Sequence, residues 1–201
     1  MSGASVDLTA HAQEVAPLLL GALITSRVDG QRVVVRLTEV EAYGGEGEDP
    51  GSHAFRRQTP RNATMFGPPG RAYVYFTYGM HWCLNVVTRP DGVAGAVLLR
   101  AGEIVEGIDV ARDRRPSSTT DRDLARGPAR LTMALGVTGV LDGAHLLAAR
   151  SPLRLQLRDP LPSEEIGISP RTGVGGAGAQ TPWRFFLRDQ PTVSPYRKAA
   201  R

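Results

Sequence analysis

The sequence of 201 residues predicts a single α+β domain built around a largely antiparallel sheet. Segments rich in β-branched and apolar residues alternate with short turn signals such as Asp29-Gly30, which favour hairpins over long crossovers. Segments with a helical pattern are few and short, and glycine and proline cluster between the apolar segments. Because there is no internal repeat or second composition regime, residues 1–201 are expected to form one domain.

The N-terminal segments are predicted to form a helix over Thr9–Leu20 and two strands over Ala22–Val28 and Arg32–Tyr43. Asp7 or Thr9 is expected to cap the helix, and Gly21 to follow its end. Pro17 should kink or shorten this helix because proline lacks the backbone donor. The pair Asp29-Gly30 should close a tight hairpin between the two strands.

The second of these strands carries two carboxylates, Glu39 and Glu41, in an otherwise apolar pattern. Counting by two places both on the face that begins with Val33 and Val35. An unpaired buried carboxylate is costly and has a raised pKa, so such a strand is a candidate wall of an active site. The competing interpretations are a face that becomes exposed at the strand end, or a glutamate paired with an arginine.

A long connection, Gly44–Arg71, follows this strand and is rich in glycine, proline, aspartate, asparagine and arginine. Long irregular loops inside a small domain are usually functional or disordered. Because it carries several arginines and His53, we expect this loop to face a ligand.

The remaining elements are predicted as strands over Ala72–Thr88, Val93–Glu106, Leu153–Leu157, Ile166–Ser169 and Trp183–Arg188, and helices over Ile108–Arg115 and Pro128–Leu135. Tyr78-Gly79 interrupts the first of these segments, so it should form two strands with Tyr78 at the turn. The glycine-rich segment Gly173–Gly178 is expected to be a flexible loop, since it lacks the lysine of a phosphate-binding loop.

Composition limits the class of protein. The formal net charge is +4 and the computed pI is about 9.7, which suits a polyanionic partner, although Lys198 is the only lysine. Cys83 is the only cysteine, so no internal disulfide is expected and a reduced, cytoplasmic protein is indicated. Neither a signal segment nor a membrane span is expected, and the four separated histidines predict no metal site.

Three features therefore remain as candidates for chemistry: a carboxylate on an apolar strand, a group of tyrosines, and surrounding arginines. Tyrosines in strands are more often core residues, and singly they indicate little. Together the features suit a site that stacks a flat ring and activates one water beside a phosphate backbone. Enzymes that flip bases out of a duplex have this construction, and Tyr78 is a plausible wedge.

Several strings, in this order, resemble the alkyladenine (3-methyladenine) DNA glycosylase family: TEVEAY, RQTPRNATMFGPPGRAYVYFTYGMHWCLNVV, AVLLRAGEIVEG and SPRTGVGGAG followed by PWRFFLRD. The likeness runs from the first helix to Val193. It implies a single compact α+β domain with a curved antiparallel sheet and peripheral helices. His81 departs from the tyrosine found there in some members.

The resemblance implies a role for individual residues. Glu41 matches the general base that activates the hydrolytic water, and Glu39 matches a neighbouring position without that role. Asn85 matches the residue that excludes guanine by crowding its 2-amino group. The other matches are Tyr43, His53 and Tyr75 for contacts with the flipped base, Tyr78 for insertion into the minor groove, and Arg100 near the water and the lesion backbone.

The implied activity is that of a monofunctional DNA glycosylase acting on alkylated or deaminated purines in double-stranded DNA and initiating base excision repair. Such an enzyme would need no cofactor and no metal. It would act as a monomer that does not associate with a membrane, and it would reside in the cytoplasm, at the nucleoid in a bacterial cell. The alternatives are a non-catalytic binder of damaged DNA and a small-molecule nucleosidase. The basic C-terminal tail and the first few residues are expected to be mobile.

Overall fold

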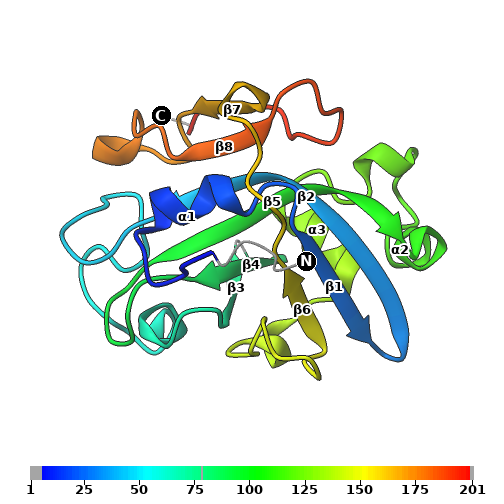
Figure 1. Ribbon diagram of the computed structural model, residues 1–201, viewed down its shortest axis with the longest axis horizontal. Helices are drawn as coiled ribbons and strands as arrows, with labels where there is room; N and C mark the ends of the chain where they lie inside the picture. The colour runs from blue at the N-terminus through cyan, green and yellow to red at the C-terminus, as the bar shows by residue number, and fades with distance from the viewer. Residues whose placement is uncertain (1–5, 78, 200–201) are drawn as a thin grey trace.

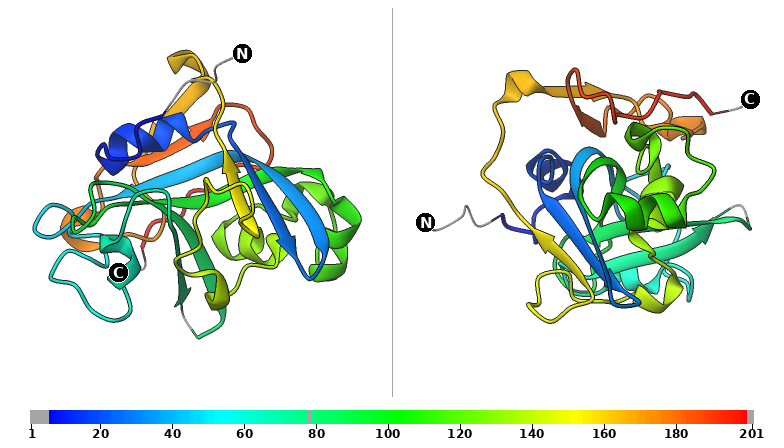
Figure 2. Two further views of the ribbon diagram at one scale, coloured as in Figure 1. Left: turned by 60° about the horizontal axis from the view of Figure 1, so that its bottom comes forward. Right: turned by 90° about the vertical axis from the view of Figure 1, so that its right-hand side faces the viewer.

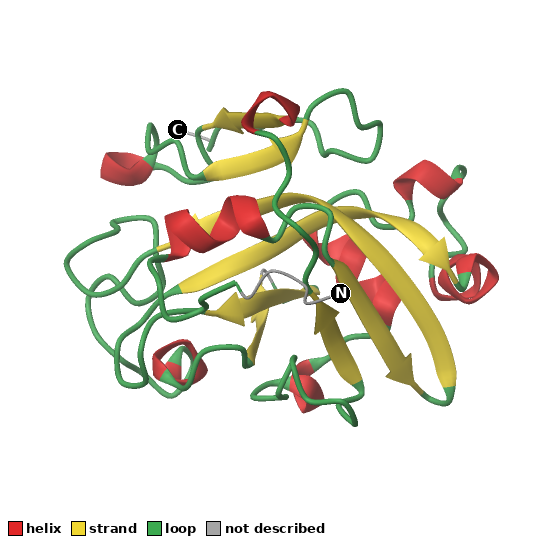
Figure 3. Ribbon diagram, viewed as in Figure 1, coloured by secondary structure: helices red, strands yellow, loops and turns green. Residues whose placement is uncertain are grey.

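A computed structural model describes residues 6–77 and 79–199. These residues form an eight-stranded sheet in which every pairing is antiparallel, with three α-helices at its periphery (Figures 1 and 3). The strands are β1 (Leu23–Val28), β2 (Gln31–Tyr43), β3 (Ala72–Thr77), β4 (His81–Val87), β5 (Ala96–Glu106), β6 (Leu153–Gln156), β7 (Ile166–Ser169) and β8 (Arg184–Leu187). The helices are α1 (Ala12–Leu18), α2 (Ile108–Arg114) and α3 (Pro128–Leu135). The predicted fold class is confirmed.

The strand order is β3-β4-β5-β2-β1-β6, and β2 is the strand that joins the parts of the sheet. Its first half pairs with β1 and residues Glu39–Glu41, near its end, pair with β8, while β5 runs along its other edge. The sheet curls as it passes from one set of partners to the next, and the β7–β8 pair lies beyond α1 (Figures 1 and 2). The end of β2 is therefore enclosed on both edges.

The β1–β2 hairpin follows directly from its turn residues. Asp29 and Gly30 have positive φ angles of 54° and 72°, as a two-residue type I′ turn requires. Val28 pairs with Gln31 across this turn, as the sequence predicts.

Helix α1 begins later than predicted, at Ala12, and no side chain caps it. Asp7 instead accepts hydrogen bonds from the backbone nitrogen and the hydroxyl of Thr9, forming a local turn ahead of the helix. The helix ends at Leu18, one residue after Pro17, so the proline shortens it. Gly21 follows with a φ of 78°.

Two of the three irregularities in the pairing of β2 with β5 compensate each other. Thr38 is an extra residue on β2 between the Leu37–Gly102 and Glu39–Ala101 pairs, and Arg100 is an extra residue on β5 directly afterwards. Gly102 permits this close approach, because a Cβ there would lie 2.3 Å from a Val35 methyl group. Such bulges redirect side chains.

The predicted face of β2 is wrong beyond Leu37 for this reason. The main core includes Val33, Val35 and Leu37 and then Val40 and Ala42, so the extra residue shifts the alternation by one. Glu39 and Glu41 consequently point away from the main core. Both are nevertheless fully buried, because Arg184 of β8 and the loops that carry Thr172 and Ser194 contact the carboxylates on that side.

No helix among the described residues is long and apolar enough to cross a membrane.

Candidate active site

A cavity of about 440 Å³ opens beside the end of β2. Its walls come from β2, β3, β4 and β5, the start of α3, and two loops that the sequence places far apart. The lining residues include Tyr43, His53, Tyr73, Tyr75, Asn85, Arg100, Pro128, Thr172 and Gly173. This set contains every predicted substrate-binding residue, so the structure brings Tyr43, His53, Tyr75, Asn85 and Arg100 together.

The long loop after β2 faces this cavity, as predicted, through Pro50–His53 and Met65. The Nδ1 atom of His53 lies 3.2 Å from the Tyr73 hydroxyl, and its ring packs edge-on against Tyr75 at 4.6 Å between centroids. Burial, together with the charge of Arg61, lowers the pKa of His53 below its ordinary value. The imidazole is therefore neutral near pH 7.

Two tyrosines of β3 complete the aromatic wall. The rings of Tyr73 and Tyr75 lie 5.2 Å apart between centroids, and burial raises the pKa of each hydroxyl, so both stay protonated. Opposite them on β4, the side-chain amide of Asn85 donates to the Tyr73 carbonyl at 2.9 Å. This bond fixes the amide at the wall of the cavity.

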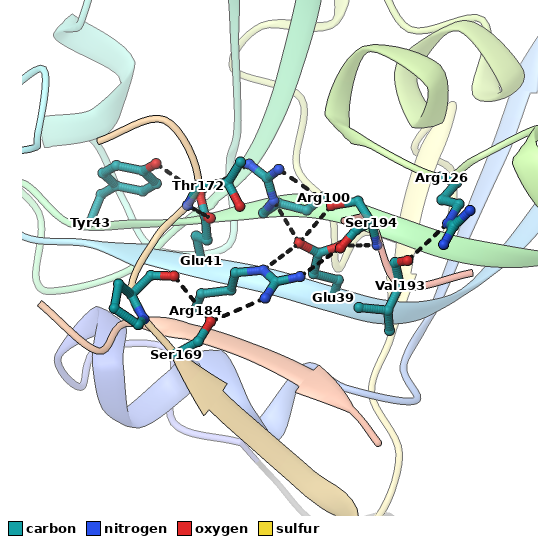
Figure 4. Close-up of polar contacts among 11 residues, drawn as sticks. Glu39, Glu41, Tyr43, Arg100, Arg126, Ser169, Thr172, Arg184, Val193 and Ser194 are labelled. Carbon is teal, nitrogen blue, oxygen red and sulfur yellow. Dashed lines mark hydrogen bonds and ion pairs between the residues drawn. The ribbon is translucent and has the colours of Figure 1, made fainter. Parts of the chain in front are cut away.

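Glu41 lies directly behind this wall and not on it, since it is fully buried and absent from the cavity lining. Its carboxylate accepts hydrogen bonds from the Tyr43 hydroxyl at 2.9 Å and from Arg100 at 3.2 Å. The backbone N–H of Thr172 donates to the other oxygen at 2.6 Å (Figure 4). All three donors line the cavity, so they connect Glu41 to it.

The pKa of Glu41 is raised above its ordinary value. Burial is the main cause of the raised pKa, and the negative charge of Glu39 raises it further. Arg100, the Thr172 N–H and the Tyr43 hydroxyl act to lower the pKa but do not outweigh burial. Burial also raises the pKa of Tyr43 well above its usual range, so the hydroxyl remains a donor. A carboxylate with a raised pKa beside a cavity is suited to accept a proton.

Glu39, two residues earlier, is held quite differently. Its Oε1 accepts from Arg100 at 2.8 Å, Arg184 at 2.7 Å and the Ser194 hydroxyl at 2.9 Å. Its Oε2 accepts from the Ser194 backbone at 2.7 Å (Figure 4). Burial acts to raise the pKa of Glu39, but the two arginines outweigh it and the pKa is lowered. Glu39 therefore stays ionised and anchors Arg100, which in turn contacts Glu41.

These two glutamates form a pair whose environments separate their pKa values, a pattern typical of catalytic carboxylates. The sequence alternatives for Glu41 were an exposed strand end or a simple ion pair. An exposed strand end is excluded because Glu41 is fully buried. A simple ion pair describes Glu39 better than Glu41. The organising role of Glu39 could not be predicted from the sequence, because its partners are up to 155 positions away.

A second buried ion pair fixes the loops around the site. Arg171, which is fully buried, donates to both Asp49 oxygens at 2.5 and 2.6 Å and to the Ala42 carbonyl at 2.9 Å. Its guanidinium also lies 4.6 Å from the centre of the Tyr43 ring. Gly51 leaves room for it, since a Cβ there would meet Arg171 at 2.6 Å. The pair thereby positions Tyr43 and the neighbouring Thr172.

The glycine-rich segment forms part of the cavity wall. Gly176–Gly178 form a turn of 3-10 helix, and Gly173 and Gly175 line the cavity. The backbone of Arg197 accepts a hydrogen bond from Gly173 at 2.9 Å, so the C-terminal segment is attached to the rim of the site. The mobility expected of the C-terminal tail stays a prediction.

Tyr78, the predicted wedge, lies outside the described residues. The strands on either side of the turn are β3 and β4, as predicted, and Thr77 and His81 line the cavity. Among residues 6–77 and 79–199, no group of three or more histidine, cysteine or acidic side chains is placed to hold a metal ion.

The site is an aromatic cavity with a buried carboxylate of raised pKa behind it, an arrangement that suits a flat ring and a proton-accepting group. Comparison with known proteins identifies the class of enzyme. Residues 7–191 match the family model described as methylpurine-DNA glycosylase. The chain therefore belongs to the methylpurine-DNA glycosylase family.

Individual relatives agree with this assignment. The chain is 53% identical over 185 residues to a Streptomyces avermitilis protein, covering 92% of this chain and 86% of the relative. It is 53% identical over 199 residues to one from Nocardia farcinica, covering 97% and 92%. A protein of Leifsonia xyli subsp. xyli is 54% identical over 195 residues, covering 94% and 90%. All three carry the name "Putative 3-methyladenine DNA glycosylase".

The family and these relatives make the protein a DNA-3-methyladenine-type glycosylase, a hydrolase of N-glycosyl bonds that acts on DNA in the repair of damage.

Proposed function

We propose that the enzyme flips alkylated or deaminated purines out of duplex DNA and hydrolyses their N-glycosidic bond with a water activated by Glu41, which initiates base excision repair. The observation that carries this proposal is the position of the Glu41 carboxylate, with its raised pKa, behind a cavity lined by aromatic rings. We further propose that it acts as a monomer on chromosomal DNA, at the nucleoid of a bacterial cell.

The cavity supports recognition of a damaged purine. Its volume of about 440 Å³ admits one flipped base, and Tyr43, His53 and Tyr75 would contact the ring. Alkylation at a ring nitrogen makes the purine cationic, and a cation is attracted to the faces of tyrosine rings. His53, being neutral, does not oppose that charge. Flipping costs least for mispaired or damaged bases, which adds to selectivity.

Hydrolysis passes through a sugar with oxocarbenium character, which needs a water on one face and a carboxylate to accept its proton. Glu41 is the proton acceptor in this scheme, and its negative charge also stabilises the positive sugar. Arg100, held by Glu39, keeps Glu41 ionised and positioned. An alkylated purine leaves as a neutral base, so it needs no proton from the enzyme.

Two other functions are distinguishable from this one. A non-catalytic binder of damaged DNA would bind lesion duplexes without releasing a base. A nucleosidase would cleave free nucleosides, and its activity would depend little on salt. For the glycosylase we expect release from lesion duplex, no release from the matching nucleoside, and activity at subsaturating enzyme that falls steeply with salt through counterion release. Cleavage of the nucleoside at a comparable rate would contradict the proposal.

Asn85 is proposed to exclude guanine, and Asn85→Ala tests this. The amide projects at the cavity wall and is fixed by the Tyr73 carbonyl. Its removal should allow measurable release of guanine, since the clash with the 2-amino group is lost. Release of hypoxanthine, which lacks that group, is the control and should change little. Unchanged rejection of guanine would place the discrimination elsewhere in the cavity.

Tyr78 is proposed to fill the space that the flipped base vacates. Tyr78→Ala should weaken binding to lesion duplex and slow release, since no side chain would then occupy the stack. Tyr78→Phe keeps the ring and should behave nearly as the wild type. Lesion-duplex affinity that is the same in the alanine variant would rule out the insertion role.

A further inference from the structure

The two oxygens of Glu41 have unequal surroundings. Oε2 accepts two hydrogen bonds, from Tyr43 and Arg100, whereas Oε1 accepts a single one, from the Thr172 N–H, among the described residues. A carboxylate oxygen has two lone-pair positions for acceptance. Oε1 therefore keeps a position for a further donor, and a water that gives a proton to Glu41 would approach that oxygen.

Thr172 also has an unusual side chain. Its hydroxyl is buried and makes no hydrogen bond within the described part of the chain. Among the described residues, three other buried side-chain atoms have no hydrogen-bond partner, one each on Thr88, Arg115 and Arg171. None of these three residues lines the cavity. An unpaired buried hydroxyl costs free energy, so each instance needs an explanation. Here the hydroxyl belongs to the residue whose backbone holds the proposed general base.

Covalent geometry limits how far apart the two groups are. A threonine hydroxyl lies roughly 3 to 4 Å from its own backbone nitrogen, and the Thr172 nitrogen is 2.6 Å from Glu41 Oε1. The hydroxyl is thus at most about 6.6 Å from that oxygen, so one water that hydrogen-bonds to both groups is within reach.

We propose that Thr172 Oγ1 is a catalytic group that orients the attacking water together with Glu41 Oε1. The inference rests on the proposed function, in which Glu41 is the general base. The water donates one proton toward Glu41 and the other toward Thr172, so its lone pair is directed at C1′ of the sugar. Its oxygen bonds to C1′ as the C1′–N bond breaks, the bonding pair leaves with the purine, and the first proton passes to Glu41.

The variant Thr172→Val tests this role cleanly. Valine has nearly the same shape and keeps the backbone N–H that contacts Glu41, but it lacks the hydroxyl. Thr172→Ser is the matched control, because it restores the hydroxyl without the methyl group. Thr172→Ala provides a second hydroxyl-free variant should the valine variant not fold.

The readout is single-turnover base release from a duplex with one methylated, cationic purine, at saturating enzyme. Thr172→Val should be slower by about tenfold, as for loss of one hydrogen bond in the transition state, with affinity for the duplex within about twofold. Its melting temperature should not fall, because an unpaired buried polar group is removed. Thr172→Ser should release base within about threefold of the wild-type rate. The acid limb of the pH–rate profile should keep its midpoint, since the backbone donor to Glu41 is unchanged.

Three results would overturn the role of the hydroxyl. One is a wild-type rate in Thr172→Val; another is an equally slow Thr172→Ser; the third is a shift of the acid limb, which would mean that the residue acts through the ionisation of Glu41. If the wild-type enzyme releases no base from any lesion duplex, the proposed function fails and this inference falls with it. Normal release that is indifferent to Thr172→Val would refute the inference alone.

Discussion

Glu41→Gln is expected to release base at least about a hundredfold more slowly than the wild type. Glutamine has the size of glutamate but cannot accept the proton of the attacking water. Because the lining of the cavity does not include Glu41, affinity for lesion duplex should stay within a few fold. Single-turnover release and duplex binding, measured on the same preparation, give the two numbers. Glu103→Gln, at an exposed carboxylate of β5, is the matched control and should act as the wild type.

The pH dependence follows from the direction of the pKa shift. Glu41 must be ionised to act as a base, and its pKa is raised above the ordinary value of 4.5. The rate should therefore fall as the pH decreases, with a midpoint above 4.5. Residual release by Glu41→Gln should lack this limb. Substantial turnover in the glutamine variant, with the limb intact, would assign the base to another group.

Glu39→Gln should instead destabilise the fold. Glu39 is the shared partner of Arg100 and Arg184, both nearly fully buried, and glutamine would leave Arg184 without its ion-pair partner and Arg100 with Glu41 alone. Breaking a buried ion pair by removing one partner costs about 3–5 kcal/mol, or a melting temperature lower by roughly 10 °C in a chain of this size. Thermal or urea unfolding measures the change.

Two comparisons make this prediction specific. Glu106→Gln breaks the exposed pair with Arg32 and should cost at most about 1 kcal/mol of folding free energy.

The pKa of Glu39 is lowered in the folded state, so the ionised carboxylate stabilises the fold at pH values above the ordinary pKa of 4.5. This stabilisation is lost as the pH falls through the lowered pKa. The difference between wild type and Glu39→Gln should accordingly shrink in acid. Equal stability at pH 7 would show that the arginines are compensated by other groups.

Local sequence signals predicted those elements whose determinants are local. The Asp29-Gly30 turn fixes its hairpin through two positive φ angles, and α3 has the predicted bounds because Pro128 begins it and Gly136 ends it with a φ of 69°. The motifs likewise indicated the residues that meet in the cavity, since each lies on a strand or loop whose type was predicted.

The sequence could not predict features that depend on distant parts of the chain. The bulge at Thr38 arises from pairing with β5, so simple alternation placed Glu39 and Glu41 on the wrong face. Ser194 binds Glu39 from 155 positions away, and it lies beyond the residues that the family model matches. Arg171 and Asp49 are 122 positions apart, and no local pattern pairs them.

Analysis of the products formed by the wild-type enzyme tests the central claim most directly. A duplex with one methylated purine is incubated with excess enzyme, with borohydride present in a parallel sample. Water-only hydrolysis predicts one free base per duplex and a full-length abasic strand that breaks only on alkali treatment, with no protein–DNA adduct. The only lysine, Lys198, is exposed, so no buried lysine is available to attack the sugar. A trapped adduct that survives deletion of Lys198 and blocking of the N-terminus, or tight binding without any free base, would contradict the account.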